Sequence, residues 1–192
     1  MSRLYLFALL APLYDRIFAT VNLDRLLRLL ELPADCSLLD VGGGTGRVSG
    51  RLRGTVGQIV VTDASEPMLR QARNKQGLHP VCARAERLPF PDSSFERVVV
   101  VDAFHHFHDQ GQAAGELLRV LAPTGRLVVE EPNIEHLLVK IVAAGERLAA
   151  MRSRFFRPEE IRLIFERLGG RATTHIDDPV NAWLVVEKTP AP

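Results

Sequence analysis

The sequence predicts an α/β fold with a doubly wound, mostly parallel sheet that helices cover on both faces. Apolar segments of strand length alternate along the chain with stretches of helical period. The segments LLDV, IVVT, VVVV and LVVE are apolar almost throughout, as expected of strands whose two faces are both buried. A run of glycines follows the first segment, at the edge where open parallel sheets bind their ligands.

The strand-length segments are ordered as in a parallel sheet, because each of the first five precedes a helical or loop segment. We expect helices to begin near Thr45 and near Pro158. Residues 134–150 also have helical character, with apolar residues on more than one face. The seven expected strands are residues 37–41, 58–62, 80–83, 97–101, 126–130, 171–176 and 182–187.

The composition fits one compact domain over residues 1–192. Of the 192 residues, 46% are hydrophobic and 24% are charged, which is enough for a sizeable core. The 24 Lys and Arg residues nearly balance the 23 Asp and Glu residues, so the chain lacks the basic excess typical of nucleic-acid binding. We therefore expect no nucleic-acid partner.

The cysteines and the N-terminus indicate where the protein works. Cys36 and Cys82 have neither metal-ligand spacing nor the density of a disulfide scaffold, which predicts a reducing, cytoplasmic setting without structural zinc. An apolar run over residues 4–11 follows Arg3 but is too short to span a bilayer, and no small-x-small cleavage site follows it. We expect an N-terminal helix packed on the domain.

Four glycines in five positions distinguish the turn after the first strand. Gly42, Gly43, Gly44 and Gly46 follow the acidic residue Asp40. Glycine lacks a Cβ and tolerates a positive φ, so backbone N–H groups can approach a ligand closely. A tight turn without a ligand needs only one or two glycines, so the excess indicates a ligand site.

The spacing of these glycines separates three classes of ligand. A phosphate-binding P-loop needs a Lys after its last glycine, and no Lys follows here. The dinucleotide fingerprint G-x-G-x-x-G needs a third glycine at the position of Arg47, which weakens the case for NAD. The remaining pattern is D-x-G-x-G-x-G, formed by Asp40, Gly42, Gly44 and Gly46.

This pattern closely resembles the first motif of class I S-adenosylmethionine-dependent methyltransferases. The resemblance continues in the family's order through VVTDASEPMLRQAR, AERLPFPDSSFERVVVVDAFHHF and LLRVLAPTGRLVVEEP. The subgroup it resembles includes the menaquinone and ubiquinone biosynthesis methyltransferases and bacterial phospholipid N-methyltransferases. The resemblance implies a Rossmann-like seven-stranded sheet with a C-terminal antiparallel hairpin. It also implies S-adenosylmethionine as cofactor, S-adenosylhomocysteine as product and a small apolar or lipid-like acceptor.

The resemblance divides the single domain into three parts. Residues 1–34 are expected to form an N-terminal helical cap, and residues 35–132 a cofactor-binding core. Residues 133–192 are expected to supply substrate-side helices and the final strands.

The resemblance also implies which residues bind the cofactor. Asp63 ends the second strand, where an acid accepts hydrogen bonds from both ribose hydroxyls, and Met68 is expected against adenine. The Ala85 backbone N–H is expected near a ring nitrogen. Arg84 stands where the family usually has an Asp that accepts a hydrogen bond from the adenine amino group, so adenine recognition is expected to be altered. The implied residues are Asp40, Gly42, Gly43, Gly44, Gly46, Asp63, Ala64, Met68, Ala85, Glu86 and Asp102.

Three histidines follow the fourth strand and are candidates for work on the acceptor. Methyl transfer is an in-line displacement that depends mainly on alignment, so a base is needed only for an acceptor that holds a proton. His106 is either a general base and substrate contact or a packing residue. A metal site formed by His105, His106 and His108 is not expected, since a strand-end H-H-x-H run cannot easily turn three rings inward.

Three acidic residues end the fourth and fifth strands. Asp102 is either a catalytic pocket residue near the amino end of the cofactor or a helix N-cap. Of Glu130 and Glu131, one is expected to face the acceptor and the other solvent. The expected acceptor contacts are Tyr14, His105, His106, Glu131 and Phe155.

The acceptor side leaves several alternatives open. Arg152, Arg154 and Arg157 surround Phe155, and this segment with residues 134–150 is either a lid for an apolar acceptor or two core helices and a solvated loop. The lid would permit peripheral contact with a membrane. For the chain as a whole, the alternatives are an NAD(P)-dependent oxidoreductase and an inactive, methyltransferase-like binding protein.

Overall fold

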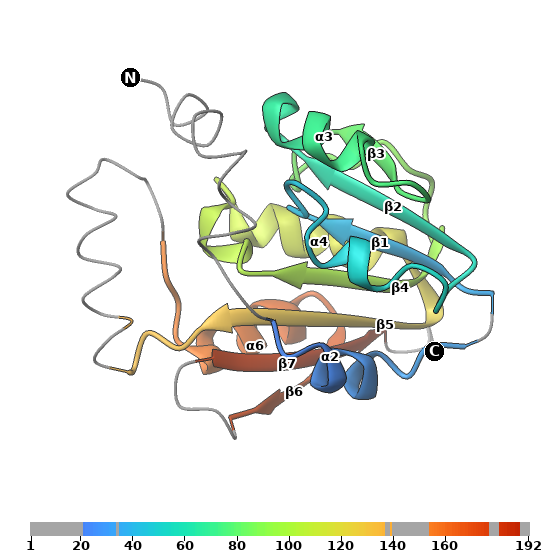
Figure 1. The fold of residues 1–192 in the computed structure, drawn as a ribbon. Helices are drawn as coiled ribbons and strands as arrows, with labels where there is room; N and C mark the ends of the chain where they lie inside the picture. The colour runs from blue at the N-terminus through green and yellow to red at the C-terminus, as the bar shows by residue number, and fades with distance from the viewer. Residues whose placement is uncertain (1–20, 34, 137–138, 140–153, 177–180, 189–192) are drawn as a thin grey trace.

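A computed structural model describes the protein at residues 21–33, 35–136, 139, 154–176 and 181–188. Within these residues the chain forms one seven-stranded sheet with the strand order β3-β2-β1-β4-β5-β7-β6 (Figure 1). Strands β1 to β5 run parallel to one another, whereas β7 pairs antiparallel with both β5 and β6. The predicted doubly wound, mostly parallel sheet with antiparallel C-terminal strands is therefore confirmed.

The strands occupy the segments that the apolar pattern predicts, with ends shifted by a few residues. The largest shift is in β5, which begins at Leu121 rather than at Arg126. The strands are β1 (Ser37–Val41), β2 (Gln58–Asp63), β3 (His79–Cys82), β4 (Phe95–Val101), β5 (Leu121–Pro132), β6 (Gly170–His175) and β7 (Asn181–Lys188). The order of strands reverses between β1 and β4, where doubly wound sheets open a crevice for ligands.

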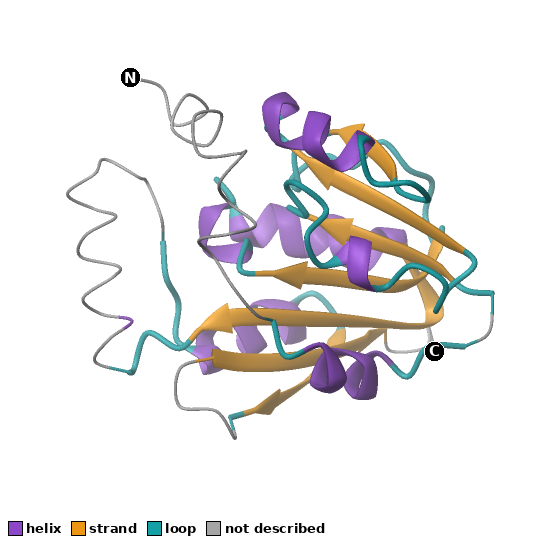
Figure 2. Cartoon of the chain, viewed as in Figure 1, coloured by secondary structure: helices purple, strands orange, loops and turns teal. Residues whose placement is uncertain are grey.

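Helices cover both faces of the sheet (Figure 2). They are α2 (Leu23–Leu30), α3 (Glu66–Arg73), α4 (Gln110–Val120) and α6 (Pro158–Arg167), with the short 3₁₀ helices η1 (Ser49–Arg51) and η2 (Phe104–His106). Leu117 of α4 and Phe165 of α6 belong to one buried cluster, while Leu26 of α2 and Leu69 of α3 belong to the other. The two clusters form the core on opposite faces of the sheet.

The segment after the glycine turn differs from the prediction. The helix expected from near Thr45 does not form, because the chain makes turns there and then η1. Gly46 has a φ of +70°, outside the α-helical region, and a β-carbon at Gly46 would lie 2.6 Å from Cδ1 of Leu78. Gly46 thus packs closely against Leu78 with a backbone conformation that is incompatible with the expected helix. The helix expected over residues 4–11 lies outside the described residues, as does most of that over 134–150.

The described residues include both cysteines and the helices that were searched for a membrane span. Cys36 is buried and Cys82 is exposed, and both are free thiols. Over the ranges given above, no helix combines the length and the apolar character needed to cross a bilayer.

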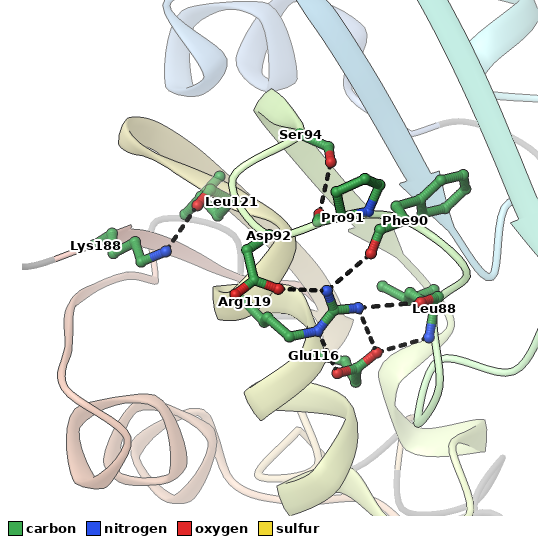
Figure 3. Close-up of polar contacts among 9 residues, drawn as sticks. All are labelled: Leu88, Phe90, Pro91, Asp92, Ser94, Glu116, Arg119, Leu121 and Lys188. Atoms are coloured by element: carbon green, nitrogen blue, oxygen red, sulfur yellow. Dashed lines mark hydrogen bonds and ion pairs between the residues drawn. The ribbon is translucent and has the colours of Figure 1, made fainter.

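Arg119 on α4 anchors the loop that joins β3 to β4 (Figure 3). Its guanidinium donates to the carbonyl oxygens of Leu88 at 3.0 Å and Phe90 at 2.8 Å. It also pairs with Asp92 at 2.8 Å and with Glu116 at 2.6 Å. Glu116 in turn accepts the Leu88 backbone N–H at 2.7 Å. Two side chains from one turn of α4 therefore hold backbone groups of the loop. The held residues come shortly after Ala85 and Glu86, which are expected to meet adenine.

Replacing Arg119 with Met should destabilise the fold by about 2 kcal/mol, since charged hydrogen bonds to two carbonyl groups are lost together with the ion pairs. Arg162→Met on α6 is the matched control, because Arg162 pairs with Glu159 and Glu166 but donates to no carbonyl in the described contacts. Urea unfolding should show a clearly smaller loss for the control. Equal losses would mean that the loop anchoring contributes nothing.

Candidate active site

A cavity of about 460 Å³ opens at the carboxyl ends of β1, β2 and β4. Its wall contains almost all of the residues predicted to bind the cofactor, although Gly46 is not among them. The lining residues are Asp40, Gly42, Gly43, Gly44, Thr45, Arg47, Val48, Asp63, Ala64, Ser65, Met68, Ala83, Arg84, Ala85, Glu86, Val101, Asp102, Ala103, His106, Phe107 and His108. The position at the β1/β4 switch point is where this class of sheet binds ligands.

Three of the four predicted turn glycines are required by packing within the protein. A β-carbon at Gly42, Gly43 or Gly46 would lie 2.6 Å from a neighbouring side-chain atom, which is too close for any residue but glycine. The neighbours are, in that order, Ala103, Asp40 and Leu78. The excess of glycines is therefore mostly explained by the close approach of the turn to the strands and loops around it.

Gly44 is the glycine whose missing side chain leaves space in the cavity. Its φ is +55°, and the atoms nearest to an added β-carbon would be Cε of Met68 at 3.5 Å and Oδ2 of Asp63 at 3.8 Å. These are ordinary contacts that the protein itself would tolerate. A side chain at Gly44 would instead occupy the space in which a ligand lies against the backbone.

Asp63 lies at the end of β2 with both carboxylate oxygens oriented by backbone groups. Oδ2 accepts the Gly44 N–H at 3.0 Å, and Oδ1 accepts the Ser65 N–H at 2.7 Å. Burial raises the pKa of Asp63, against the lowering effect of these two N–H groups. Each oxygen keeps a further lone pair, so the carboxylate can accept hydroxyl groups from a ligand.

Ser65, two residues after Asp63, carries a buried hydroxyl that has no hydrogen-bond partner among the described residues. Its Oγ makes no hydrogen bond in the described contacts, and Ser65 does not use it to cap α3. A buried hydroxyl without a hydrogen bond is costly, and this one lines the cavity. The sequence analysis did not select Ser65, although its position two residues after Asp63 could have suggested it.

Asp40 is the most deeply buried carboxyl of the cavity. The Ser49 hydroxyl donates to its Oδ2 at 2.5 Å. Burial raises the pKa of Asp40 from 3.8 to about 6, despite the Ser49 hydrogen bond and the nearby positive charge of Arg47. Its ionisation is therefore sensitive to a cation placed in the cavity.

The wall expected to meet adenine is built around Glu86. Arg84 pairs with Glu86 at 3.2 Å, and Oε1 of Glu86 accepts the backbone N–H groups of His108 at 2.6 Å and Asp109 at 3.2 Å. Burial opposes ionisation, but the hydrogen bond from Arg84 and the backbone donors outweigh it and lower the pKa of Glu86. Arg84 thus replaces the family's acid with a cation that is paired to the neighbouring carboxylate.

Glu131, which was expected at the acceptor, does not line the cavity. Its Oε1 accepts the N–H groups of Ala103 at 3.0 Å and Phe104 at 2.7 Å, and its Oε2 accepts the His105 N–H at 3.2 Å. The Nδ1 atom of His105 lies 2.7 Å from Oε2. These four contacts use the four acceptor positions of a carboxylate. The expectation that Glu130 or Glu131 faces solvent is also wrong, since both are buried.

The three histidines, predicted as a group, have different positions. His106 and His108 line the cavity, whereas His105 is buried behind its wall with only 3% of its surface exposed. In the described residues no group of three His, Cys, Asp or Glu side chains is arranged to hold a metal ion. Of the adjacent residues His105 and His106, only the half-buried His106 is therefore open to a ligand in the cavity.

The remaining predicted residues divide between cavity, interior and undescribed chain. Asp102 lines the cavity with a left-handed φ of 52°, and it caps neither following helix, since Ala103 and Asp109 occupy those N-cap positions. Phe155 stacks on His105 with ring centroids 4.3 Å apart and does not line the cavity. Tyr14 lies outside the described residues. The cavity residues missed by the sequence analysis include Thr45, Ser65 and Phe107.

The chain is similar to methyltransferases in sequence. A family model described as a methyltransferase domain matches residues 39–129. A demethylmenaquinone methyltransferase from Thermus thermophilus is 37% identical over 140 residues, which are 66% of this chain and 64% of the relative. A ubiquinone/menaquinone biosynthesis C-methyltransferase from Hahella chejuensis is 40% identical over 108 residues, or 51% of this chain and 43% of the relative. The chain spans about half the length of the known relatives it matches.

Solved structures share the fold over nearly the whole chain. A SAM-dependent methyltransferase from Thermotoga maritima gives a TM-score of 0.75 at 23% identity, over 96% of this chain and 99% of that one. A chain of the complex between the Haloferax volcanii Trm112 methyltransferase activator and a methyltransferase gives 0.77 at 18% identity, over 95% and 97%. At these identities the similarity establishes the fold alone.

The domain match and the sheet order point in the same direction. Residues 39–129 match a methyltransferase domain, and the whole sheet has the fold of a solved S-adenosylmethionine-dependent methyltransferase. The sequence relatives named above are methyltransferases of ubiquinone and menaquinone biosynthesis, and the chain is 37–40% identical to them over the matched residues. The family resemblance seen in the sequence is therefore confirmed.

Gly44→Ala should weaken S-adenosylhomocysteine binding at least about tenfold, a loss of about 1.4 kcal/mol, because the methyl group enters the cavity. Gly54→Ala is the matched control. Gly54 has a similar φ of +78°, its β-carbon would meet nothing within 4 Å, and it does not line the cavity. Both variants should lose about 1–2 kcal/mol of stability from the left-handed backbone. Calorimetry that finds the same affinity in both variants would contradict the cavity role of Gly44.

Asp40 should make the fold less stable as pH rises through the range between its two pKa values, 3.8 unfolded and about 6 folded. The folded state holds this proton more tightly than the unfolded state, so the stability that the proton contributes is lost as pH rises through about 6. Asp40→Asn removes this dependence, and its stability relative to the natural protein should rise by up to about 3 kcal/mol between pH 4 and 7.5. Asp35→Asn, an exposed carboxyl, is the control in urea unfolding at each pH.

Proposed function

We propose that this protein transfers a methyl group from S-adenosylmethionine to a carbon of a small aromatic acceptor of the quinol type. The observation that carries the proposal is the cavity at the β1/β4 switch point, with one open glycine and oriented carboxylates, in a chain related to quinone methyltransferases. The relatives' names state the acceptor only for the relatives. Transfer of that activity to this chain is our inference.

The cavity residues fit the cofactor at several points. Asp63 has lone pairs left for the hydroxyls of a ribose. The Ser65 hydroxyl has no partner in the described part of the chain, and a ligand atom would supply one. Gly44 leaves its backbone open to the cavity, and Met68 gives an apolar surface against which adenine can pack. Asp40 is placed to be stabilised as a carboxylate by the positive charge of the ligand.

The bound cofactor supplies a methyl group on a positively charged sulfur, and transfer neutralises that charge. The contribution of this chain is to hold the cofactor and acceptor in line in a site closed from water. His106 lines the same cavity and can accept a proton from a quinol hydroxyl or from the methylated ring carbon. Asp102 lies on the cavity wall after β4 and contributes negative charge.

The acceptor side of the cavity suits a flat apolar ring. Val101, Ala103 and Phe107 are apolar lining residues beside His106. A quinol with a long apolar tail resides in a membrane, so we include peripheral membrane contact in the proposal. Arg154 and Arg157 support it, since both are exposed near Phe155 and can meet anionic headgroups.

The proposed function is tested first by cofactor binding. S-adenosylhomocysteine should bind with measurable heat and NAD should not. Asp63→Asn should weaken S-adenosylhomocysteine about 10–100-fold, because a charge-assisted acceptor for two hydroxyls is lost. Glu66→Gln removes a carboxylate from the exposed start of α3 and is the matched control, with unchanged affinity. Tight NAD binding would favour the oxidoreductase, and binding of neither would favour the inactive binding protein.

The acceptor is tested by methyl transfer. Radiolabelled S-adenosylmethionine is supplied with demethylmenaquinol in phosphatidylglycerol vesicles, and in parallel with phosphatidylethanolamine vesicles lacking quinol. Label in the quinol supports the proposal, whereas label in the lipid headgroup amine shows a phospholipid methyltransferase. Loss of quinol methylation in detergent-free solution without vesicles would support the peripheral membrane contact.

A further inference from the structure

The start of η2 is held by one carboxylate from a different strand. Glu131 of β5 accepts the three consecutive backbone N–H groups of residues 103–105, between 2.7 and 3.2 Å. These groups begin a 3₁₀ helix and have no partners within it, so the carboxylate supplies what the helix end lacks. Because Glu131 is only 3% exposed, this bonding occurs away from water and sets the position of η2 on the sheet.

The same carboxylate determines the proton on His105. As a carboxylate, Glu131 can only accept hydrogen bonds, and it already accepts three backbone N–H groups. The Nδ1 atom of His105, 2.7 Å from Oε2, then carries the hydrogen of this contact. The geometry assigns the Nδ1–H form of His105. Active sites are often supported in this way, by a carboxylate from another part of the fold that fixes the tautomer and the ring orientation of a histidine.

The His105 ring lies between His106 and Phe155. The ring centroids of His105 and His106 are 3.9 Å apart, and Phe155 stacks on His105 at 4.3 Å with 14° between the planes. The Arg154 N–H donates to the His105 carbonyl at 2.8 Å, which ties the neighbouring segment to η2. Only His106 of these rings lines the cavity. Motion of His105 would therefore move the ring that a ligand touches.

We propose that Glu131 and His105 are positioning residues that hold His106 at the acceptor end of the cavity. This inference rests on the proposed function, in which His106 meets the acceptor. Glu131 acts through the backbone of η2 and through Nδ1–H of His105, and His105 passes this constraint to His106 by ring packing. Phe155 and the Arg154 backbone support the far side of His105.

Glu130 provides a matched control for Glu131. It is also a buried glutamate and is the adjacent residue of β5, but successive residues of a strand point to opposite faces. Consistent with this, the neighbouring β5 residues Val129 and Val128 belong to the core clusters on opposite faces of the sheet. Glu130→Gln and Glu131→Gln are therefore the same substitution at neighbouring positions of β5 whose side chains lie on opposite faces of the sheet.

The first test reads the tautomer and needs neither cofactor nor acceptor. Imidazole ¹⁵N shifts should show His105 protonated at Nδ1 in the natural protein and in Glu130→Gln. In Glu131→Gln the amide group donates to Nδ1, so the proton should move to Nε2. An Nε2–H form in the natural protein, or no change in Glu131→Gln, overturns the assignment.

The second test separates positioning from simple folding by measuring kcat and KM with demethylmenaquinol. Glu131→Gln should lower kcat at least tenfold while the Kd for S-adenosylhomocysteine changes less than twofold, and Glu130→Gln should retain kcat within twofold. His105→Asn keeps an N–H toward Glu131 and should retain more kcat than His105→Phe, which keeps the ring but loses the donor. Equal loss in Glu130→Gln and Glu131→Gln, or parallel loss of kcat and cofactor affinity, overturns the proposal.

The two proposals fail in distinguishable ways. If the natural protein binds no S-adenosylhomocysteine, the proposed function fails, while the ¹⁵N measurement still decides the Glu131–His105 assignment. If the cofactor binds and the quinol is methylated but the Glu131→Gln and Glu130→Gln variants have the same kcat, only the positioning role fails.

Discussion

The cavity depends on carboxylates that accept backbone N–H groups from the loops around it. Asp63 holds the glycine turn and the start of α3, Glu86 holds the start of the segment before α4, and Glu131 holds η2. Glu116 holds Leu88 in the loop before β4 in the same way. Carboxylate acceptors suit this role because charge-assisted hydrogen bonds are stronger than neutral ones, and unpaired buried N–H groups are costly.

This arrangement explains how short loops form a defined wall. The loop between β3 and β4 is held at one end by Glu86, which bonds to the backbone of His108 and Asp109, and further on by Arg119. Ala85 lies between these restraints and lines the cavity. The wall expected to meet adenine is therefore supported by α4 and by His108 and Asp109, the residues just before this helix. This support is present even though Arg84 replaces the family's acid.

The acidic residues also explain the electrostatics of the site. Burial raises the pKa of both Asp40 and Asp63, so neither carboxylate is fully compensated by its hydrogen bonds. A positively charged ligand would supply the missing compensation. This favours a ligand with positive charge close to Asp40 and Asp63, beside the cations Arg47 and Arg84 that also line the cavity.

Much of the framework could be predicted from local sequence. The strands were predictable because each is a short apolar run, and apolar runs report burial on both faces. The glycine turn, Asp40 and Asp63 were predictable because a tight turn at the end of a parallel strand imposes a pattern on consecutive residues. The sequence pattern wrongly predicted a helix near Thr45. Gly46 has a positive φ and packs against Leu78, and the periodicity of nearby residues does not reveal such a contact.

By itself, then, the sequence determined the doubly wound sheet, the strand ends at which the cavity forms and the resemblance to methyltransferases. Only the tertiary structure decided that His105 is buried, that His106 faces the cavity and that Glu131 supports both. The physical reason is that the partner of η2 lies on a strand, at Glu131, which is 28 positions after Ala103 along the chain. Residue types and spacing show which groups need hydrogen bonds, but the folded chain decides which group supplies them.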